Sequence, residues 1–273
     1  MSSIDNGIDE VLHEIVDGVA WITLNRPDAA NALPPSSRDQ LIELLESASA
    51  DRAVRAVVLA ANGKHFCSGA DLAASAGRDG EQPPPPGPGD IARTLRLGSQ
   101  RLVAAVQDCE KPVIAELHGA AAGIGAHLVL ACDFIVAAKT SRIIEVFARR
   151  ALVPDGGGAY LLPRLVGPIK AKQLMMLADD LSADDALALG LLYAVVADDE
   201  LRAATTALAQ RLATGPTRSL ALTKWLVNRS LESSREQAFA DEGLAQELNM
   251  ATADAQEGLR SFGERRPPVY TGR

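Results

Sequence analysis

The sequence has little cysteine, no long apolar run and no excess of basic residues, and each shortage excludes a class of protein. Its three cysteines, Cys67, Cys109 and Cys132, are an odd number in apolar surroundings and lack metal-ligand spacing. We therefore expect reduced thiols, a cytoplasmic location and no metal site. No apolar run approaches the roughly 18 residues of a membrane span, so we expect no membrane partner. A formal charge of −8 argues against nucleic acid as the main partner.

Two kinds of apolar pattern divide the 273 residues into two regions. As far as residue 197, strand-like and helix-like spacings alternate, and the length allows a substantial core. From residue 198 onward the pattern is helical almost throughout, with Gly215 before Pro216 as a first-turn proline. We predict a core at residues 1–197 and an α-helical C-terminal region at residues 198–273.

Strand and helix patterns alternate regularly within the predicted core. Two β-like runs at 11–16 and 19–24 flank Asp17-Gly18, which indicates a hairpin turn. The sequence predicts further strands at 54–60, 112–117 and 134–138, and helices at 35–50, 91–109 and 123–131. This alternation implies parallel strands covered by helices, that is, an α/β fold.

Two glycine-punctuated segments suggest a shared chemical role. The first runs from His65 to Leu72 and the second from His118 to Gly125, and each has the pattern of a buried strand that turns into a helix. At such a turn several backbone N–H groups have no partner within the helix. Two of them that converge on one point can stabilise a developing oxyanion. The sequence therefore predicts a site that polarises a carbonyl group.

A proline-rich segment interrupts the alternation after the first glycine turn. Residues 80–90, with Pro83 to Pro86 at their centre, can neither continue a helix nor form a central strand. We expect an exposed loop there, either a lid or insertion beside the substrate entrance or a recognition sequence for a partner domain.

A series of short motifs runs along nearly the whole chain. In order, the motifs are Asn25-Arg26-Pro27, Phe66 to Leu72, Gly119 to Gly125, Ala131-Cys132-Asp133, Val153 to Gly158, Leu162 to Gly167, Ser182 to Ala186, Gly190-Leu191, Glu257-Gly258 to Phe262, Arg265-Arg266 and Gly272-Arg273. This order resembles that of the crotonase family, the enoyl-CoA hydratases and isomerases, and the resemblance is greatest to the ring-isomerase branch of the phenylacetate pathway.

The resemblance implies a spiral of ββα turns, a helical C-terminal region that mediates trimerisation, and trimers that sometimes pair into hexamers. It implies an acyl-CoA thioester as substrate, with coenzyme A as part of the substrate and no separate cofactor. The thioester oxygen would lie between the backbone N–H groups of Ala70 and Ile124. Ile124 replaces the usual glycine, so its backbone must be one that isoleucine can adopt. The positions implied to contact coenzyme A are Arg26, Ser68, Ala70, Asp71 and Leu72.

The residues that would move a proton differ from those of typical hydratases. The positions of the two family glutamates hold His127 and Phe147. Glu145 is two residues away and would share the face of Phe147 on a strand. Asp155, in a turn before three glycines, is the remaining acid or base, although it could simply cap a helix that starts near Gly157. His127 is either a second acid or base or a hydrogen-bonded core histidine.

Three functions remain open at this point. An enoyl-CoA-type isomerase would shift a proton through a thioester enolate, with Asp155 as the group that carries it. An enoyl-CoA hydratase would need a second acidic group to activate water. A catalytically weak acyl-CoA-binding protein would explain why both usual glutamates are missing. We favour the isomerase, acting on an apolar acyl group.

Overall fold

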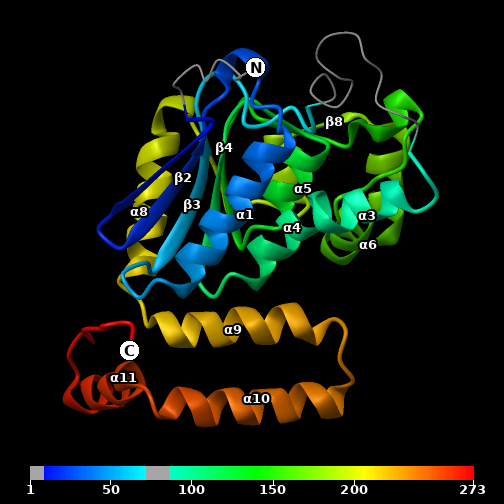
Figure 1. Ribbon diagram of the computed structural model, residues 1–273. Coiled ribbons are helices and arrows are strands. Elements are labelled where there is room, and N and C mark those ends of the chain that lie inside the picture. The colour runs from blue at the N-terminus through cyan, green and yellow to red at the C-terminus, as the bar shows by residue number, and fades with distance from the viewer. Residues whose placement is uncertain (1–8, 72–85) are drawn as a thin grey trace, which may run out of the picture.

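A six-stranded sheet forms the centre of the protein in a computed structural model, which describes residues 9–71 and 86–273 (Figure 1). The strand order is β1-β2-β3-β4-β6-β9, and only the β1–β2 pair is antiparallel. Asp17 and Gly18 both have positive φ between β1 and β2, which confirms the predicted hairpin. The strands are β1 (Val11–Val16), β2 (Val19–Leu24), β3 (Ala56–Ala61), β4 (Val113–Leu117), β6 (Phe134–Ala138) and β9 (Ala194–Val196).

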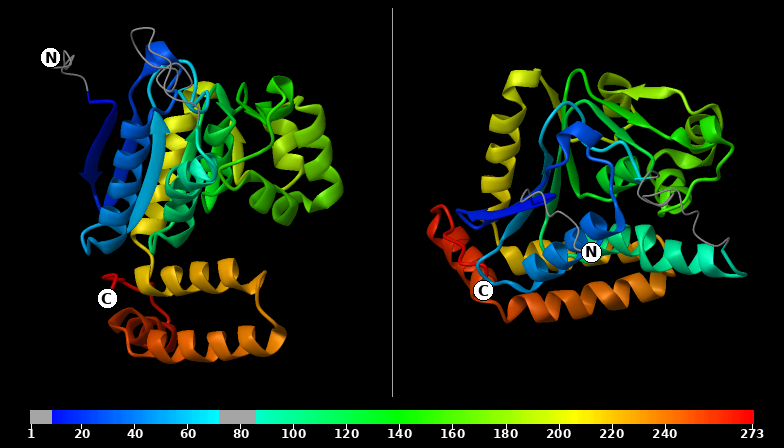
Figure 2. Two further views of the ribbon diagram at one scale, coloured as in Figure 1. Left: turned by 45° about the vertical axis from the view of Figure 1, so that its right-hand side comes forward. Right: turned by 45° about the horizontal axis from the view of Figure 1, so that its top comes forward.

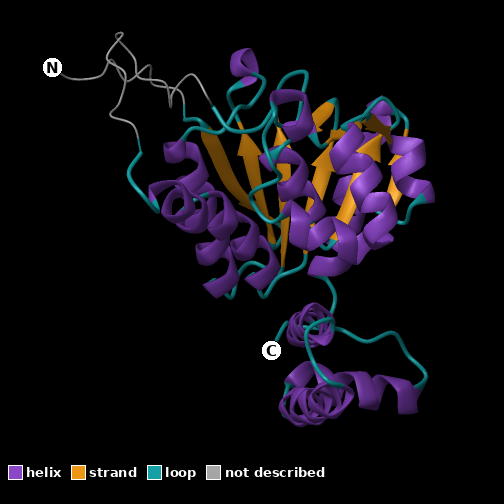
Figure 3. Ribbon diagram, turned by 90° about the vertical axis from the view of Figure 1, so that its right-hand side faces the viewer, coloured by secondary structure: helices purple, strands orange, loops and turns teal. Residues whose placement is uncertain are grey.

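Helices cover both faces of this sheet, so its central strands are buried on both sides (Figures 2 and 3). Alternate residues of β3 enter two separate apolar clusters: Val57 and Leu59 on one face, Val58 on the other. The first face packs against α1 (Pro35–Ala50) and α4 (Ser99–Asp108). The second packs against α8 (Leu201–Ala213), which lies beyond the predicted boundary at residue 198. The parallel, helix-covered α/β sheet was predicted correctly.

A second, smaller sheet carries the residues that follow the second glycine segment. Its order is β5-β7-β8, and its three-residue strands are too short to show an alternating pattern in the sequence. The strands of this sheet are β5 (Ala120–Ala122), β7 (Arg142–Ile144) and β8 (Asp180–Ser182). The helices and the 3-10 turn between and after these strands are α5 (Ile124–Leu130), η2 (Val146–Arg150), α6 (Gly158–Leu177) and α7 (Ala183–Ala188). Two further 3-10 turns are η1 (Pro27–Ala29) and η3 (Asp198–Glu200).

Several predicted boundaries were wrong. The helix expected at 91–109 is broken at Gly98 (φ −111°, ψ −101°) into α3 (Asp90–Leu97) and α4. The strand expected from residue 54 begins at Ala56, and Pro216 is the N-cap of α9 (Thr217–Ser230) rather than a residue of its first turn. The helix expected after the first glycine turn, Leu72 and Pro83 to Pro85 lie outside the described residues; Pro86 is exposed.

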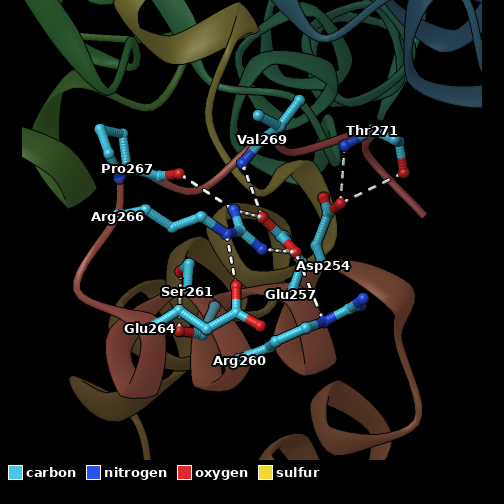
Figure 4. A network of polar contacts seen from close by, with 10 residues as sticks. Asp254, Glu257, Arg260, Ser261, Glu264, Arg266, Pro267, Val269 and Thr271 are labelled. Carbon is cyan, nitrogen blue, oxygen red and sulfur yellow. Dashed lines mark hydrogen bonds and ion pairs between the residues drawn. The ribbon is translucent and has the colours of Figure 1, made fainter.

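The C-terminal region is helical, as predicted: α8 packs on the sheet, and the helices that follow it project from the body as an arm (Figure 3). Helices α9 and α10 (Arg235–Met250) lie antiparallel, and α11 (Ala253–Glu264) follows. The chain end folds back on α11, where the Asp254 carboxylate accepts hydrogen bonds from the N–H groups of Thr271 and Gly272, and Glu257 pairs with Arg266 (Figure 4). Within the described ranges, none of the helices combines the length and hydropathy of a membrane span.

Candidate active site

The two glycine segments pack directly against each other. The N–H of Cys67 donates to the Ala120 carbonyl, and the N–H of Ala122 donates to the Cys67 carbonyl. A Cβ on Gly69 would lie 3.2 Å from the Ala122 carbonyl oxygen, and one on Gly125 would lie 2.6 Å from the Cys67 carbonyl oxygen. Because these contacts leave no room for side chains, the glycines allow the two turns to form one unit.

Both predicted oxyanion donors belong to this unit. Ile124 is the first residue of α5, where helical N–H groups lack partners within the helix. Among the described residues, neither the Ala70 N–H nor the Ile124 N–H donates a hydrogen bond. The residue with positive φ is Gly123 (φ 54°) and not Ile124, so an isoleucine at position 124 causes no backbone strain. These two backbone N–H groups, without partners among the described residues, thus belong to segments that pack against each other.

Asp155 lies in a glycine turn that packs against Ile124. Gly156 and Gly157 have positive φ, and a Cβ on Gly156 would lie 2.6 Å from Cδ1 of Ile124. Helix α6 begins only at Gly158, with Gly157 as its N-cap and no capping side chain. The alternative in which the Asp155 carboxylate caps this helix was therefore wrong. The carboxylate accepts no hydrogen bond from any described residue, and so it is available for another partner.

The surroundings of Asp155 favour its neutral form more than water does. Burial raises the pKa of Asp155 above its ordinary value, and Glu145 raises it further, while His127 opposes both effects. A carboxyl group with a raised pKa is a better proton acceptor, and it is closer to a useful acid–base range at neutral pH.

His127 is fully buried beside Asp155 and is held on several sides. Its Nε2 lies 3.1 Å from Oε2 of Glu145, and its ring stacks on Phe147 with 5.3 Å between centroids and 14° between planes. The structure thus shows the hydrogen-bonded buried histidine that was one of the two alternatives. Glu145 does lie on the same side as Phe147, although it precedes the η2 turn instead of sitting in a strand.

Several of the residues predicted to contact coenzyme A make hydrogen bonds and ion pairs that hold the first glycine turn in place. The Arg26 guanidinium donates to Asp71 at 2.9 Å and pairs with Glu10 at 3.1 Å. The N–H of Ser68 donates to the Ala30 carbonyl. Ala70 is exposed, Asp71 is half-buried, and Leu72 lies outside the described residues. In this structure Arg26 and Asp71 therefore position the turn that carries Ala70.

Three residues of this region were missed or underrated by sequence reasoning. Asn31, buried with φ 52°, donates to the carbonyls of Asn62 and His65 and accepts from the Arg26 N–H. Its signal in the sequence is weak, although asparagine tolerates the left-handed region. The Oγ of Ser99 is buried next to Gly156, and Glu145 contacts His127. The described residues contain no group of three His, Cys, Asp or Glu side chains that could hold a metal ion.

Comparison with known proteins identifies the fold and the family. The enoyl-CoA hydratase/isomerase family profile matches residues 14–273. A probable enoyl-CoA hydratase from Rhodobacter capsulatus is 35% identical, and 1,2-epoxyphenylacetyl-CoA isomerase from Escherichia coli is 34% identical; in each comparison 96% of this chain and 98% of the relative are covered. A trans-2-decenoyl-[acyl-carrier-protein] isomerase from Streptococcus mutans is 32% identical over 97% of this chain and 98% of the relative.

The crystal structure of a putative enoyl-CoA hydratase from Streptomyces coelicolor A3(2) superposes with a TM-score of 0.89 and 38% identity, covering both chains completely. The two sheets, the unit of glycine turns and the helical arm are thus a crotonase fold. The chain belongs to the crotonase family of enoyl-CoA hydratases and isomerases, enzymes of acyl-CoA metabolism.

Proposed function

We propose that this enzyme is an enoyl-CoA-type isomerase that moves a proton between carbons of an acyl thioester. The observation that carries this proposal is the contact between the Asp155–Gly156 turn and Ile124, one of the two proposed oxyanion donors. This contact supports a position for Asp155 beside the group that would hold the thioester oxygen, and among the described residues none donates a hydrogen bond to the Asp155 carboxylate. Proton migration needs at least one acid–base group to carry the proton and an oxyanion hole to stabilise the enolate.

The proposed reaction runs through an enolate. Asp155 removes a proton from a carbon next to the unsaturation, and the electron pair moves onto the thioester oxygen, which the N–H groups of Ala70 and Ile124 stabilise. The protonated carboxyl then returns the proton to another carbon, and the thioester carbonyl reforms. Loss of one oxyanion donor in comparable enzymes costs about 3–4 kcal/mol of transition-state stabilisation. The backbone donors need no reorganisation during the reaction.

The positions of the two usual glutamates argue against hydration as the main reaction. His127 and Phe147 stack on each other there, and the nearby Glu145 directs one oxygen to His127. Two carboxylates around one water molecule are therefore not available at these positions. Hydration is the second candidate because a buried carboxylate does lie within the site and because relatives named isomerase and hydratase are equally similar. Acyl-CoA binding without turnover is the third.

Substrate assays with matched variants test the proposal. Wild-type protein should convert a cis-3-enoyl-CoA into the conjugated trans-2-enoyl-CoA, followed by its absorbance, and should hydrate crotonyl-CoA more slowly. The Asp155→Asn variant should lose isomerisation while calorimetry shows unchanged acyl-CoA binding. Asp184→Asn, at an exposed position of α7, is the control and should be fully active. Isomerisation at the wild-type rate by Asp155→Asn would refute the role of Asp155.

The same proposal includes a coenzyme A site and an assembly. We place the coenzyme A part of the substrate along residues Ser68 to Asp71, next to Arg26. A homotrimer or a dimer of trimers would cover the apolar side chains that the arm exposes, among them Phe239 and Leu231, each 64% exposed. Light scattering after size exclusion measures this assembly. The three unpaired thiols suit a reducing, cytoplasmic compartment.

A further inference from the structure

Three polar groups gather near the turn that follows Asp155, and one atom of each lacks a partner among the described residues. Within the described part of the chain, Nδ1 of His127, Oε1 of Glu145 and Oγ of Ser99 are buried without a hydrogen bond. A Cβ on Gly156 would lie 3.3 Å from Cβ of Ser99 and 3.4 Å from Nδ1 of His127, so both groups adjoin this turn. A buried polar group without a partner is unfavourable, so a purely structural cluster of this kind would destabilise the fold.

The packing around His127 fixes the direction of its ring. Phe147 covers one face, and Gly158 fits so closely that a Cβ there would lie 2.1 Å from Nε2. The Nε2 edge therefore meets Glu145, and the Nδ1 edge meets Gly156, next to Asp155. An ionised carboxylate can only accept a hydrogen bond, so its contact with Nε2 requires the proton on Nε2 and leaves the Nδ1 lone pair free.

We propose that Glu145 is a positioning residue for the reaction: it holds His127 with Nε2 protonated and Nδ1 toward the Asp155–Gly156 turn, and through this pair it sets the charge environment of Asp155. The proposal rests on the proposed isomerase function only where Asp155 is given its catalytic role. His127 is fully buried, so it acts on a substrate through its neighbours and not by contact. In place of a second catalytic carboxylate, the buried pair of Glu145 and His127 thus supports one catalytic carboxylate, that of Asp155.

The charged groups around the pair are few. Apart from burial, the Glu145 charge raises the pKa of Asp155, and the His127 ring lowers it only when both of its nitrogens carry a proton. The far side of Glu145 faces an apolar cavity of about 10 Å³ with Asp179 at its rim, which holds one water molecule at most. On α4 and α6, which pack against α5, the other charged side chains are Arg101, Asp108, Arg164, Lys170 and Lys172, of which Lys170 is half-buried and the rest are exposed. Arg149 and Arg150 on η2 are exposed as well.

The test compares Glu145→Gln with a matched control. Glutamine keeps the size and an acceptor oxygen but removes the charge. Glu116→Gln is the control, because Glu116 is equally buried, at 4% exposure, yet lies on the face of the sheet that packs against α8, where it pairs with Arg202. We expect Glu145→Gln to lose about tenfold or more in isomerisation rate at neutral pH, a loss like that seen when the hydrogen-bond partner of a metal-bound histidine is removed. Glu116→Gln should keep the wild-type rate.

The pH dependence separates positioning from simple structural support. Because the Glu145 charge raises the pKa of Asp155, its removal should lower that pKa and move the acidic limb of the rate profile to lower pH. The profile of Glu116→Gln should match the wild type. A Glu145→Gln profile that coincides with the wild type would overturn the proposal.

Two nuclear magnetic resonance measurements keep the test independent of turnover. The protein has four histidines, so ¹⁵N-histidine spectra can identify His127 by comparison with His127→Gln. Wild-type His127 should be the Nε2–H tautomer, and an Nδ1–H tautomer would overturn the proposal without any variant of Glu145. Carboxyl ¹³C titration, assigned with Asp155→Asn, should show the same downward shift in Glu145→Gln. If no substrate is isomerised, the proposed function fails while these two measurements still decide the role of Glu145.

Discussion

Replacing Gly158 with alanine should disrupt the buried pair of His127 and Glu145. Gly158 is the first residue of α6, and its backbone is helical, so alanine meets no conformational obstacle there. The obstacle is steric: the new Cβ would lie 2.1 Å from Nε2 of His127, whereas ordinary contacts begin at 3.4 Å. The imidazole must therefore move by about 1.3 Å, and its 3.1 Å hydrogen bond to Glu145 breaks.

The expected cost follows from two effects. Forcing an extra methyl group into a packed region costs about 1–3 kcal/mol. Leaving the buried Glu145 carboxylate without its partner costs about 1–3 kcal/mol more, so the free energy of unfolding should fall by about 2–6 kcal/mol. For a chain of this size, the melting temperature should fall by roughly 5–15 °C. Calorimetry or urea unfolding measures both quantities.

A double-mutant cycle identifies the imidazole as the cause. In a His127→Ala background, the Gly158→Ala change should cost far less, because the clashing ring and its hydrogen bond are gone. Gly243→Ala, in the interior of α10 with nothing within 4 Å of its Cβ, is the control and should be neutral or stabilising by about 0.5–1 kcal/mol. An equal cost of Gly158→Ala in both backgrounds would refute the packing described for His127.

The remaining predictions concern a thiol, the C-terminal tail and one buried loop residue. Burial raises the pKa of Cys67 to about 12, so native protein should not react at this thiol with a thiolate-directed reagent at pH 8, while denatured protein should; reaction at equal rates would contradict the burial. The pKa of Glu257 is lowered from 4.5 to about 2, mainly by Arg266, so this contact stabilises the tail above pH 4.5 and is lost as the pH falls toward 2. The amide signal of Val269, which donates to Glu257, should titrate near pH 2 and not near 4.5. Asn31→Ala should lower the free energy of unfolding by about 2–4 kcal/mol in urea titrations, because it loses three hydrogen bonds in a left-handed conformation; a change below 1 kcal/mol would be inconsistent with this.

The sequence was sufficient for five of the six strands of the main sheet, for helices α1 and α5 and for the two glycine segments, whereas β9 and the short strands of the second sheet were not predicted. Buried strands such as β3 and β4 are short apolar runs between breakers, and their helices have clear apolar periodicity. The break at Gly98 could not be predicted, because a single glycine in a helical pattern is ordinarily tolerated. The helix-cap interpretation of Asp155 failed for a related reason: consecutive positive φ at Gly156 and Gly157 delays the start of α6, and glycine alone does not reveal its φ.

The buried pair shows why the missing glutamates could not be interpreted from the sequence alone. The resemblance to typical hydratases of the family implies that His127 and Phe147 stand at the positions of the two glutamates, and taken separately each residue would mean the loss of an acid. In three dimensions His127 and Phe147 contact each other. The chain leaves β7 at Ile144 and turns through η2, so that both Glu145 and Phe147 contact the imidazole of His127. A carboxyl group is still present, at Glu145, two residues before Phe147, where it contacts His127. A variant that restores only one family residue, His127→Glu, would therefore place two carboxylates in contact within the core. We expect it to be destabilised and to raise the pKa of one of the two carboxyls, and not to gain hydration of crotonyl-CoA.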